Sequence, residues 1–151
     1  MDGSAQNIKS LKAQSFFWKH DLIAAQAFIT AENIESLLRL HLPTQDIGLL
    51  HIDIDGNDYW ILKAITSISP IIVIMEYNAV FGPFRAITVP YVADFERSKY
   101  HYSNLYAGAS LAALCDISNE KGYGFVGTNS AGNNAYFVRR DCLGSLKELT
   151  I

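Results

Sequence analysis

The sequence is poor in cysteine, and this shortage excludes two classes of small protein. Cys115 and Cys142 are the only cysteines among 151 residues. Two cysteines cannot build the disulfide framework of a small secreted domain, and these two lack the spacing of a metal site. A chain of this length buries enough apolar surface to fold without such cross-links. We therefore expect reduced thiols in a cytoplasmic protein.

The sequence also lacks a charge excess and any long hydrophobic run. Its formal net charge is -3, and its 12 Lys and Arg residues are scattered instead of forming the basic stripe of a nucleic-acid binder. The amino terminus, Met-Asp-Gly-Ser, lacks the basic and apolar regions of a secretory signal, and no apolar stretch reaches membrane-spanning length. We therefore expect no nucleic-acid partner and no membrane span.

Hydrophobic residues make up half of the chain, and their spacing predicts alternating helices and strands. Helices are predicted at 2–19 with Ser4 as the cap, at 32–42 with Pro43 as the stop, at 59–66, and at 108–121 before Gly122. Strands are predicted at 22–29, 47–54, 71–76, 123–128 and 135–139. The result is a single α/β domain over residues 1–151.

Two features predict how the strands are arranged. The run 71–76 is apolar on both faces, which is typical of a buried parallel strand with helices on both faces of the sheet. The last two strands are joined by the Asn- and Gly-rich residues 129–134, which favour an antiparallel hairpin. We therefore expect a mostly parallel sheet with an antiparallel pair at its carboxyl-terminal end. His51, Trp18 and Trp60 are expected to be packed within this structure.

Residues 77–107 interrupt the alternating pattern with a long segment rich in aromatic residues. Loops of this length inside a compact domain are usually functional or disordered, and the aromatic content favours an ordered lid or the wall of a substrate site. The alternative is that these rings only pack over the core or against a partner. His101 lies in this segment and is a candidate base near neutral pH.

Carboxylates follow two of the predicted buried strands. Asp53, Asp55 and Asp58 come at the end of the strand 47–54, and Glu76 ends the next strand. Ligands of open α/β sheets bind beyond the carboxyl ends of the strands, so these groups should converge on one crevice. The alternative is a purely structural role, in which Asp55 or Asn57 caps the helix that follows.

Three common acidic motifs fit this cluster only in part. Asp53-Ile-Asp-Gly56 resembles the first half of the haloacid-dehalogenase phosphatase motif, with Asp53 as nucleophile and Asp55 as general acid. However, Asn57 replaces the Thr of that motif, and no later Gly-Asp run follows. An Asp-x-Asp metal site of a glycosyltransferase is a second alternative. An EF-hand is excluded because its glycine is the sixth loop residue and here it is the fourth.

A fuller match comes from an ordered set of short motifs. They are Ile-Thr-Ala-Glu-Asn-Ile at 29–34, Ile-Asp-Ile-Asp-Gly-Asn-Asp-Tyr-Trp at 52–60, Val-Ile-Met-Glu-Tyr-Asn at 73–78, Thr-Val-Pro-Tyr at 88–91, Gly-Ala-Ser-Leu at 108–111, and Lys-Gly-Tyr at 121–123 leading to Asn-Asn-Ala-Tyr-Phe-Val at 133–138. With these motifs the chain resembles FkbM-like S-adenosylmethionine-dependent methyltransferases over nearly its whole length.

The resemblance implies a Rossmann-like methyltransferase fold and methyl transfer to a small-molecule acceptor, such as the hydroxyl of a sugar, lipid or secondary metabolite. In that family Asp2 would bind the ribose hydroxyls of the cofactor, Phe28 would lie near the adenine, and Asp53 would complete the cofactor site. Asp53, Asp55, Glu76 and His101 would be the catalytic candidates, because methyl transfer requires aligned reactants and removal of a proton.

Further residues complete this expectation. Tyr77, Asn78, Tyr91 and Tyr106 are candidates for the acceptor pocket, although each tyrosine could equally be a packing residue with its hydroxyl bonded nearby. The acidic residues could also hold Mg²⁺ and lower the pKa of an acceptor hydroxyl, as in some metal-dependent O-methyltransferases.

The chain also departs from the family. A first strand and a glycine-rich loop, which hold the methionine part of the cofactor, would precede Met1, so the resemblance implies an incomplete cofactor site in this chain. The absent strand would lie between the strand ending at Asp2 and the strand ending at Asp53. We expect its absence to shift residues 22–29 against 47–54, or to pair two copies as a homodimer at the exposed edge. The alternative function is a non-catalytic remnant that acts as an interaction module.

Overall fold

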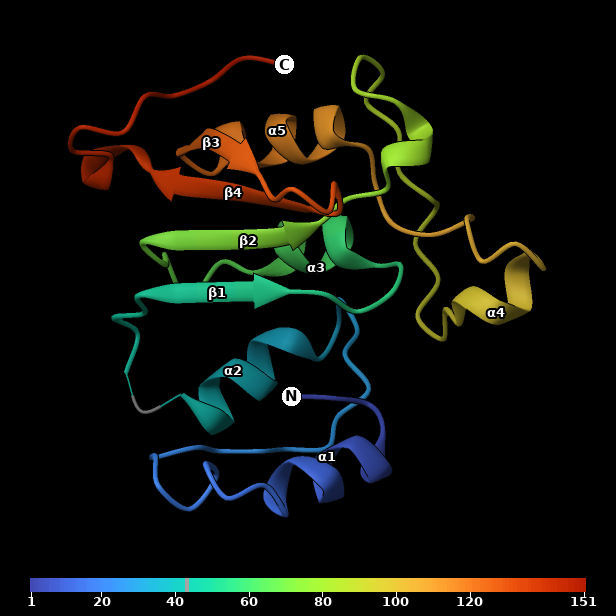
Figure 1. The fold of residues 1–151 in the computed structure, drawn as a ribbon, viewed down its shortest axis with the longest axis vertical. Helices are drawn as coiled ribbons and strands as arrows, with labels where there is room; N and C mark the ends of the chain where they lie inside the picture. The colour runs from blue at the N-terminus through green and yellow to red at the C-terminus, as the bar shows by residue number, and fades with distance from the viewer. Residues whose placement is uncertain (43) are drawn as a thin grey trace.

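A computed structural model describes residues 1–42 and 44–151, and it contains a sheet of four strands in the order β1-β2-β4-β3 (Figure 1). The strands are β1 (Leu49–Ile52), β2 (Ile72–Glu76), β3 (Tyr123–Thr128) and β4 (Asn134–Arg139). β1 and β2 are parallel, whereas β4 is antiparallel to both β2 and β3. The α/β class and the carboxyl-terminal hairpin are confirmed. The prediction of a mostly parallel sheet is wrong, because β4 inserts between β2 and β3 and makes the sheet mixed.

The helices are α1 (Ala5–Lys12), α2 (Ile34–His41), α3 (Asp58–Ala64), α4 (Arg97–Tyr100) and α5 (Leu111–Glu120). Short 3-10 helices occur at Ala79–Phe81 and Arg140–Cys142. Ser4 caps α1 as predicted, since its side chain accepts a hydrogen bond from the backbone N–H of Asn7. Pro43, the expected stop of α2, lies outside the described residues. In the described part of the chain, no helix is both long and apolar enough to cross a bilayer.

The hydrophobic core lies on one face of the sheet. Val73 and Met75 on β2 lie beside Phe137 and Ala135 on β4, and all four side chains are buried. α3 and α5 contact each other and cover this face. On the opposite face Ile72 and Ile74 are only half-buried, and His51 is exposed. The expectation of helices over both faces, with His51 packed under one, is therefore wrong, because an apolar run tolerates partial exposure as well as full burial.

The predicted strand 22–29 does not form. Among the described residues its only β pairing is an isolated parallel bridge between Asp2 and Gln26, in which the N–H of Ala27 donates to the Asp2 carbonyl at 3.0 Å. Within the described residues β1 pairs with β2 alone, so residues 22–29 have not moved onto β1. Trp18, expected to be packed, is 78% exposed. Pairing between two copies at the β1 edge stays a prediction, since a single chain does not test it.

The aromatic segment 77–107 is ordered and docks on the turn that follows β1. The indole N–H of Trp60 donates to the Val89 carbonyl at 2.9 Å, and the side-chain amide of Asn57 donates to the Val92 carbonyl at 2.8 Å. Val89, Phe95 and Ala107 form a second small hydrophobic cluster within this segment. The segment therefore becomes one wall of the space beyond the carboxyl ends of β1 and β2.

Candidate active site

Asp58 fixes the shape of the turn between β1 and α3. Its carboxylate is fully buried and accepts hydrogen bonds from the backbone N–H of Ile54 at 2.9 Å and of Gly56 at 3.0 Å. Burial raises the pKa of Asp58, and the hydrogen bonds from Ile54 and Gly56 oppose that rise. Asn57 occupies the N-cap position of α3 but makes no side-chain cap bond. Asp58, and not Asp55 or Asn57, therefore stabilises the backbone at the start of α3. The side chains of Asp53 and Asp55 are available for other contacts.

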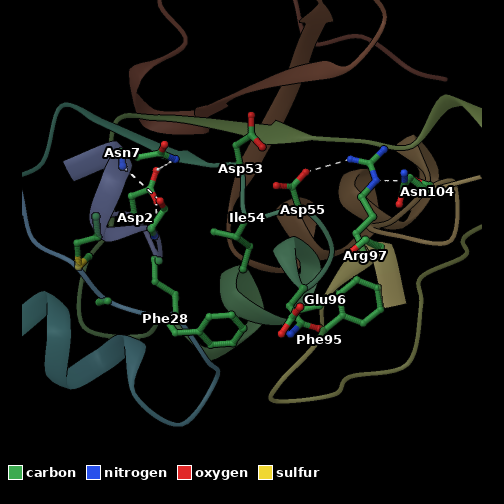
Figure 2. A pocket seen from close by; sticks show the side chains of 17 residues that line it. Asp2, Asn7, Phe28, Asp53, Ile54, Asp55, Phe95, Glu96, Arg97 and Asn104 are labelled. Carbon is green, nitrogen blue, oxygen red and sulfur yellow. Dashed lines mark hydrogen bonds and ion pairs between the residues drawn. The ribbon is translucent and has the colours of Figure 1, made fainter. Parts of the chain in front are cut away.

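Asp55 adopts an unusual backbone conformation at the tip of this turn. Its φ angle is 61°, in the left-handed region that few residues other than Gly, Asn and Asp enter readily. Its exposed carboxylate lies 3.0 Å from Nη1 of Arg97, which comes from α4 (Figure 2). The turn thus directs the Asp55 carboxylate toward the aromatic segment rather than toward α3.

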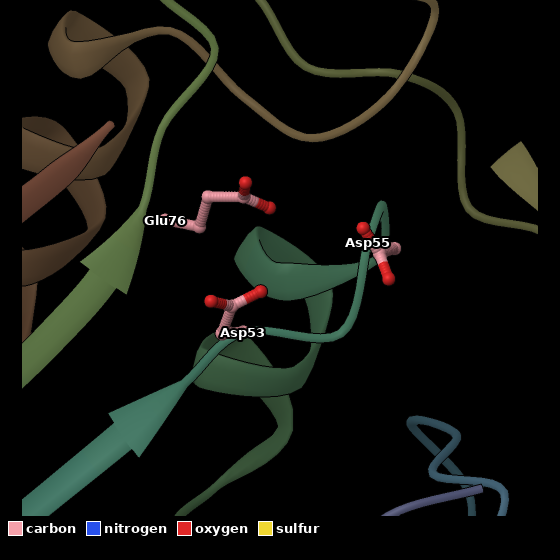
Figure 3. Close-up of side chains that lie close together, drawn as sticks. All are labelled: Asp53, Asp55 and Glu76. Carbon is pink, nitrogen blue, oxygen red and sulfur yellow. The ribbon is translucent and has the colours of Figure 1, made fainter. Parts of the chain in front are cut away.

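Three carboxylates converge where β1 and β2 end. One oxygen from each of Asp53, Asp55 and Glu76 lies within 4.8 Å of the others (Figure 3). The parallel register that places Ile52 beside Met75 brings the residues that follow these strands together, as the sequence predicted. Carboxylate oxygens are the ligands that Mg²⁺ and Ca²⁺ prefer, so the triad could hold a divalent cation.

The environment of Glu76 suits proton transfer. Burial, together with the negative charges of Asp53 and Asp58, raises the pKa of Glu76 to about 7 against the opposing charge of Arg97. A carboxylate with a pKa near the pH of the reaction exchanges protons most effectively. Glu76 is therefore the group of the triad best suited to serve as a general base near neutral pH.

A pocket of about 520 Å³ lies between the amino-terminal segment and the turn after β1 (Figure 2). Asp2 and Phe28 line one side of it, and Asp53, Ile54 and Asp55 line another. The Asp2 carboxylate accepts hydrogen bonds from the N–H of Ser4 at 2.6 Å and from Asn7, and these bonds lower the pKa of Asp2. The Phe28 ring is 51% exposed in the pocket wall. The pocket therefore combines an ionised carboxylate, an accessible aromatic ring and two of the three carboxylates of the triad, Asp53 and Asp55.

A smaller pocket of about 180 Å³ lies on the other side of Glu76. Glu76, Tyr77, Asn78 and Asn133 line it, together with Arg97, which also lines the larger pocket. The side-chain amide of Asn78 donates to the carbonyls of Leu105 and Ala107 at 2.8 and 2.9 Å. Asn78 therefore fixes the wall of this pocket by binding the aromatic segment.

Three of the predicted site residues line neither pocket. The Tyr91 hydroxyl accepts from the N–H of Ala31 at 3.0 Å and donates to the Glu32 carboxylate. Tyr106 stacks on another tyrosine with the ring centroids 5.8 Å apart, and His101 is exposed with its Nδ1 2.7 Å from a serine hydroxyl. The structure gives each of these groups a partner within the chain. Their assigned roles in binding and catalysis stay predictions.

The structure adds two residues that the sequence analysis missed. Arg97 lines both pockets. The Phe95 ring packs closely against Gly56, and a Cβ atom added at position 56 would lie 2.2 Å from Cε1 of Phe95. Gly56 in the Asp-Gly motif was the sequence feature that could have indicated the Phe95 contact, because a glycine after a strand often marks a close approach by other atoms. No periodic pattern marks Arg97, since it comes from a four-residue helix in the irregular segment.

Comparisons of the chain with family models, with curated proteins and with solved structures found no significant match.

Proposed function

We propose that this chain carries the active site of an S-adenosylmethionine-dependent methyltransferase that resembles the FkbM-like family. The larger pocket would take the cofactor, and the smaller pocket would take the methyl acceptor. The observation that carries the proposal is the contact between the two pockets: they share Arg97, and Glu76 in the smaller one lies within 4.8 Å of Asp53 and Asp55 in the larger one.

The strand arrangement supports the proposal. The resemblance implies parallel strands with acidic residues at their carboxyl ends, followed by an antiparallel pair, and the sheet has this arrangement in β1, β2, β3 and β4. It also implies that Asp2 ends a strand on the far side of the cofactor from Asp53. Asp2 makes a parallel bridge with Gln26, and the larger pocket separates Asp2 from Asp53 in Figure 2.

The residues of the larger pocket fit the groups of this cofactor. Each oxygen of the Asp2 carboxylate accepts one hydrogen bond from the chain and retains capacity for a ribose hydroxyl. The accessible Phe28 ring offers an apolar face to an adenine. The carboxylates of Asp53 and Asp55 offer negative potential to a cationic sulfonium. When bound, S-adenosylmethionine supplies a methyl group on a positively charged sulfur.

Glu76 would take the proton that an acceptor hydroxyl loses during methyl transfer. Its carboxylate reaches the smaller pocket and lies beside the triad members that face the larger one. Tyr77 and Asn133 line the same pocket and would orient the acceptor. A divalent cation held by the triad would instead lower the pKa of the acceptor hydroxyl directly, and sensitivity of the activity to a chelator separates these two routes.

Isothermal titration of S-adenosylhomocysteine tests the proposal. The chain is used alone and as the full product of its gene, with Asp2→Asn as the pocket variant and Asp46→Asn, an exposed site outside both pockets, as the control. We expect the full gene product to bind, Asp2→Asn to weaken binding about tenfold or more by loss of charge-assisted hydrogen bonds, and the control to bind normally. No binding by the full gene product would contradict the proposal and favour the non-catalytic remnant or the phosphatase alternative.

A further inference from the structure

Arg97 has a distinctive place in this site. Among the described residues it is the one Lys or Arg side chain in the linings of the two pockets. The carboxylates in these linings belong to Asp2, Asp53, Asp55 and Glu96 in the larger pocket and to Glu76 in the smaller one. Its guanidinium lies where the two pockets meet, with one third of the side chain exposed. A ligand in either pocket can therefore contact Arg97.

The hydrogen bonds of Arg97 leave donors available. Nε donates to the carbonyl of Asn104, and Nη1 donates to the Asp55 carboxylate at 3.0 Å. A guanidinium has five N–H donors in a fixed plane, so three of them have no acceptor within residues 1–42 and 44–151. These donors can bind oxygen atoms of a ligand.

The backbone around Arg97 holds the guanidinium in place. Two residues earlier, the Phe95 ring is 6% exposed and lies against Gly56, on the same turn that carries Asp55. On the other side, the Asn104 carbonyl holds Nε. A donor fixed at two points before the ligand arrives loses little entropy on binding, so it can orient a ligand as well as attract it.

We propose that Arg97 selects the acceptor, and this inference rests on the proposed methyltransferase function. The acceptor is a neutral molecule with two neighbouring oxygens: one hydroxyl donates to Glu76, and the second oxygen accepts from Arg97. The acceptor pocket has one carboxylate and one guanidinium, Glu76 and Arg97, so a neutral acceptor that pairs with both is favoured over an acceptor with a net charge. The pocket of about 180 Å³ admits one small polar end of such a molecule.

A matched series of three-carbon probes tests this selection. The full gene product is incubated with methyl-labelled S-adenosylmethionine and propane-1,2-diol, propan-2-ol, lactate or 1-aminopropan-2-ol. We expect methylation of the diol with a kcat/KM about tenfold or more above that of each other probe, since each loses one charge-assisted hydrogen bond or gains a repulsive charge. Equal methylation of propan-2-ol and the diol, or no methylation of any probe by protein that binds S-adenosylhomocysteine, overturns the inference.

Variants of Arg97 separate selection from a purely structural role. Arg97→Gln should raise the KM for the diol about tenfold to a hundredfold, with a clearly smaller change in the Kd for S-adenosylhomocysteine, and Arg97→Lys should restore part of the loss. Lys99→Gln, in the same helix and outside both pockets, is the control and should match the parent protein. An Arg97→Gln variant that keeps its preference for the diol overturns only this inference. Failure of the parent to bind S-adenosylhomocysteine overturns the proposed function and this inference together.

Discussion

Residues 1–33 and residues 34–142 are held in the fold in different ways. The structure describes every residue of the first region, and none of them is buried. The second region contains the whole hydrophobic core, beginning with Ile34 and centred on Phe137 and Met75, which are fully buried. Apolar burial is the main stabilising term in folding, so the second region supplies nearly all of the stability.

The first region is attached to the second through few contacts. The N–H of Ala31 donates to the Tyr91 hydroxyl, and the partly buried Ile29 packs against the core. Yet this region supplies Asp2 and Phe28 to the larger pocket. The pocket therefore has one wall built on the core and one wall of low local stability, and we expect a ligand to order the second wall when it binds.

Truncation of a core ring should produce the largest difference between the two regions. Phe137→Ala removes a fully buried side chain and should cost about 3 to 5 kcal/mol in free energy of unfolding. Phe16→Ala, in the first region and 45% exposed, should cost less than about 1 kcal/mol. Urea unfolding of both variants measures the contrast. Similar losses would show that residues 1–33 pack more tightly than the structure indicates.

Loss of the buried Asp58 carboxylate should have the next largest effect. Asp58→Ala leaves the N–H groups of Ile54 and Gly56 without their acceptor and should cost about 2 to 3 kcal/mol. Asp46→Ala, at an exposed position, should change the free energy of unfolding by less than about 0.5 kcal/mol. Thermal and urea unfolding check both values. A neutral Asp58→Ala would contradict its role in shaping the turn.

A methyl group at Gly56 should displace the aromatic segment. In Gly56→Ala the new Cβ would meet the Phe95 ring at 2.2 Å, and the strain should cost about 1 to 3 kcal/mol. Gly48→Ala provides the matched control, because no atom lies within 4 Å of a Cβ at that position. A double variant that also carries Phe95→Leu should recover part of the loss. If Gly56→Ala and Gly48→Ala unfold alike, Phe95 does not pack on this turn.

The smallest of these effects should be the pH dependence from Glu76. Its pKa is raised from an ordinary 4.5 to about 7 in the folded protein, so between these pH values the folded state holds a proton that the unfolded state has released. The Glu76 contribution to stability is therefore present below pH 4.5 and is lost as the pH rises through 7. The free energy of unfolding of the parent and of Glu76→Gln is measured across this pH range. It should decline with rising pH in the parent and not in the variant. Parallel curves would mean that the pKa of Glu76 is not raised.

Local sequence patterns predicted the core region better than the amino-terminal region. The apolar runs that became β1 and β2 and the hairpin residues around Gly132 were identified correctly, because burial and turn chemistry act within a few residues. The run 22–29 is also mostly apolar but forms no strand, because a strand needs a neighbour whose position lies far away in the sequence. For residues 22–29 the lack of a neighbouring strand therefore outweighed the local preference for strand structure.

The candidate site, like the fold, was predicted only in part. Asp53, Asp55 and Glu76 were brought together by the expected rule that parallel strands end at one edge. Arg97 and Phe95 could not be found, because they reach the site through the fold of an irregular segment in which no periodicity indicates direction. The roles of Tyr91, Tyr106 and His101 depended on the same segment, and the structure places these residues outside both pockets.

Chemical-shift mapping with S-adenosylhomocysteine tests the central claim most directly, because it reports where the ligand binds as well as whether it binds. Amide resonances of the full gene product are recorded during the titration. We predict the largest shifts at Asp2, Phe28 and residues 53–57, with slower hydrogen exchange in residues 1–33 once the ligand is bound. Saturating ligand that shifts none of these amides, or shifts only residues distant from both pockets, would contradict a cofactor site in the larger pocket.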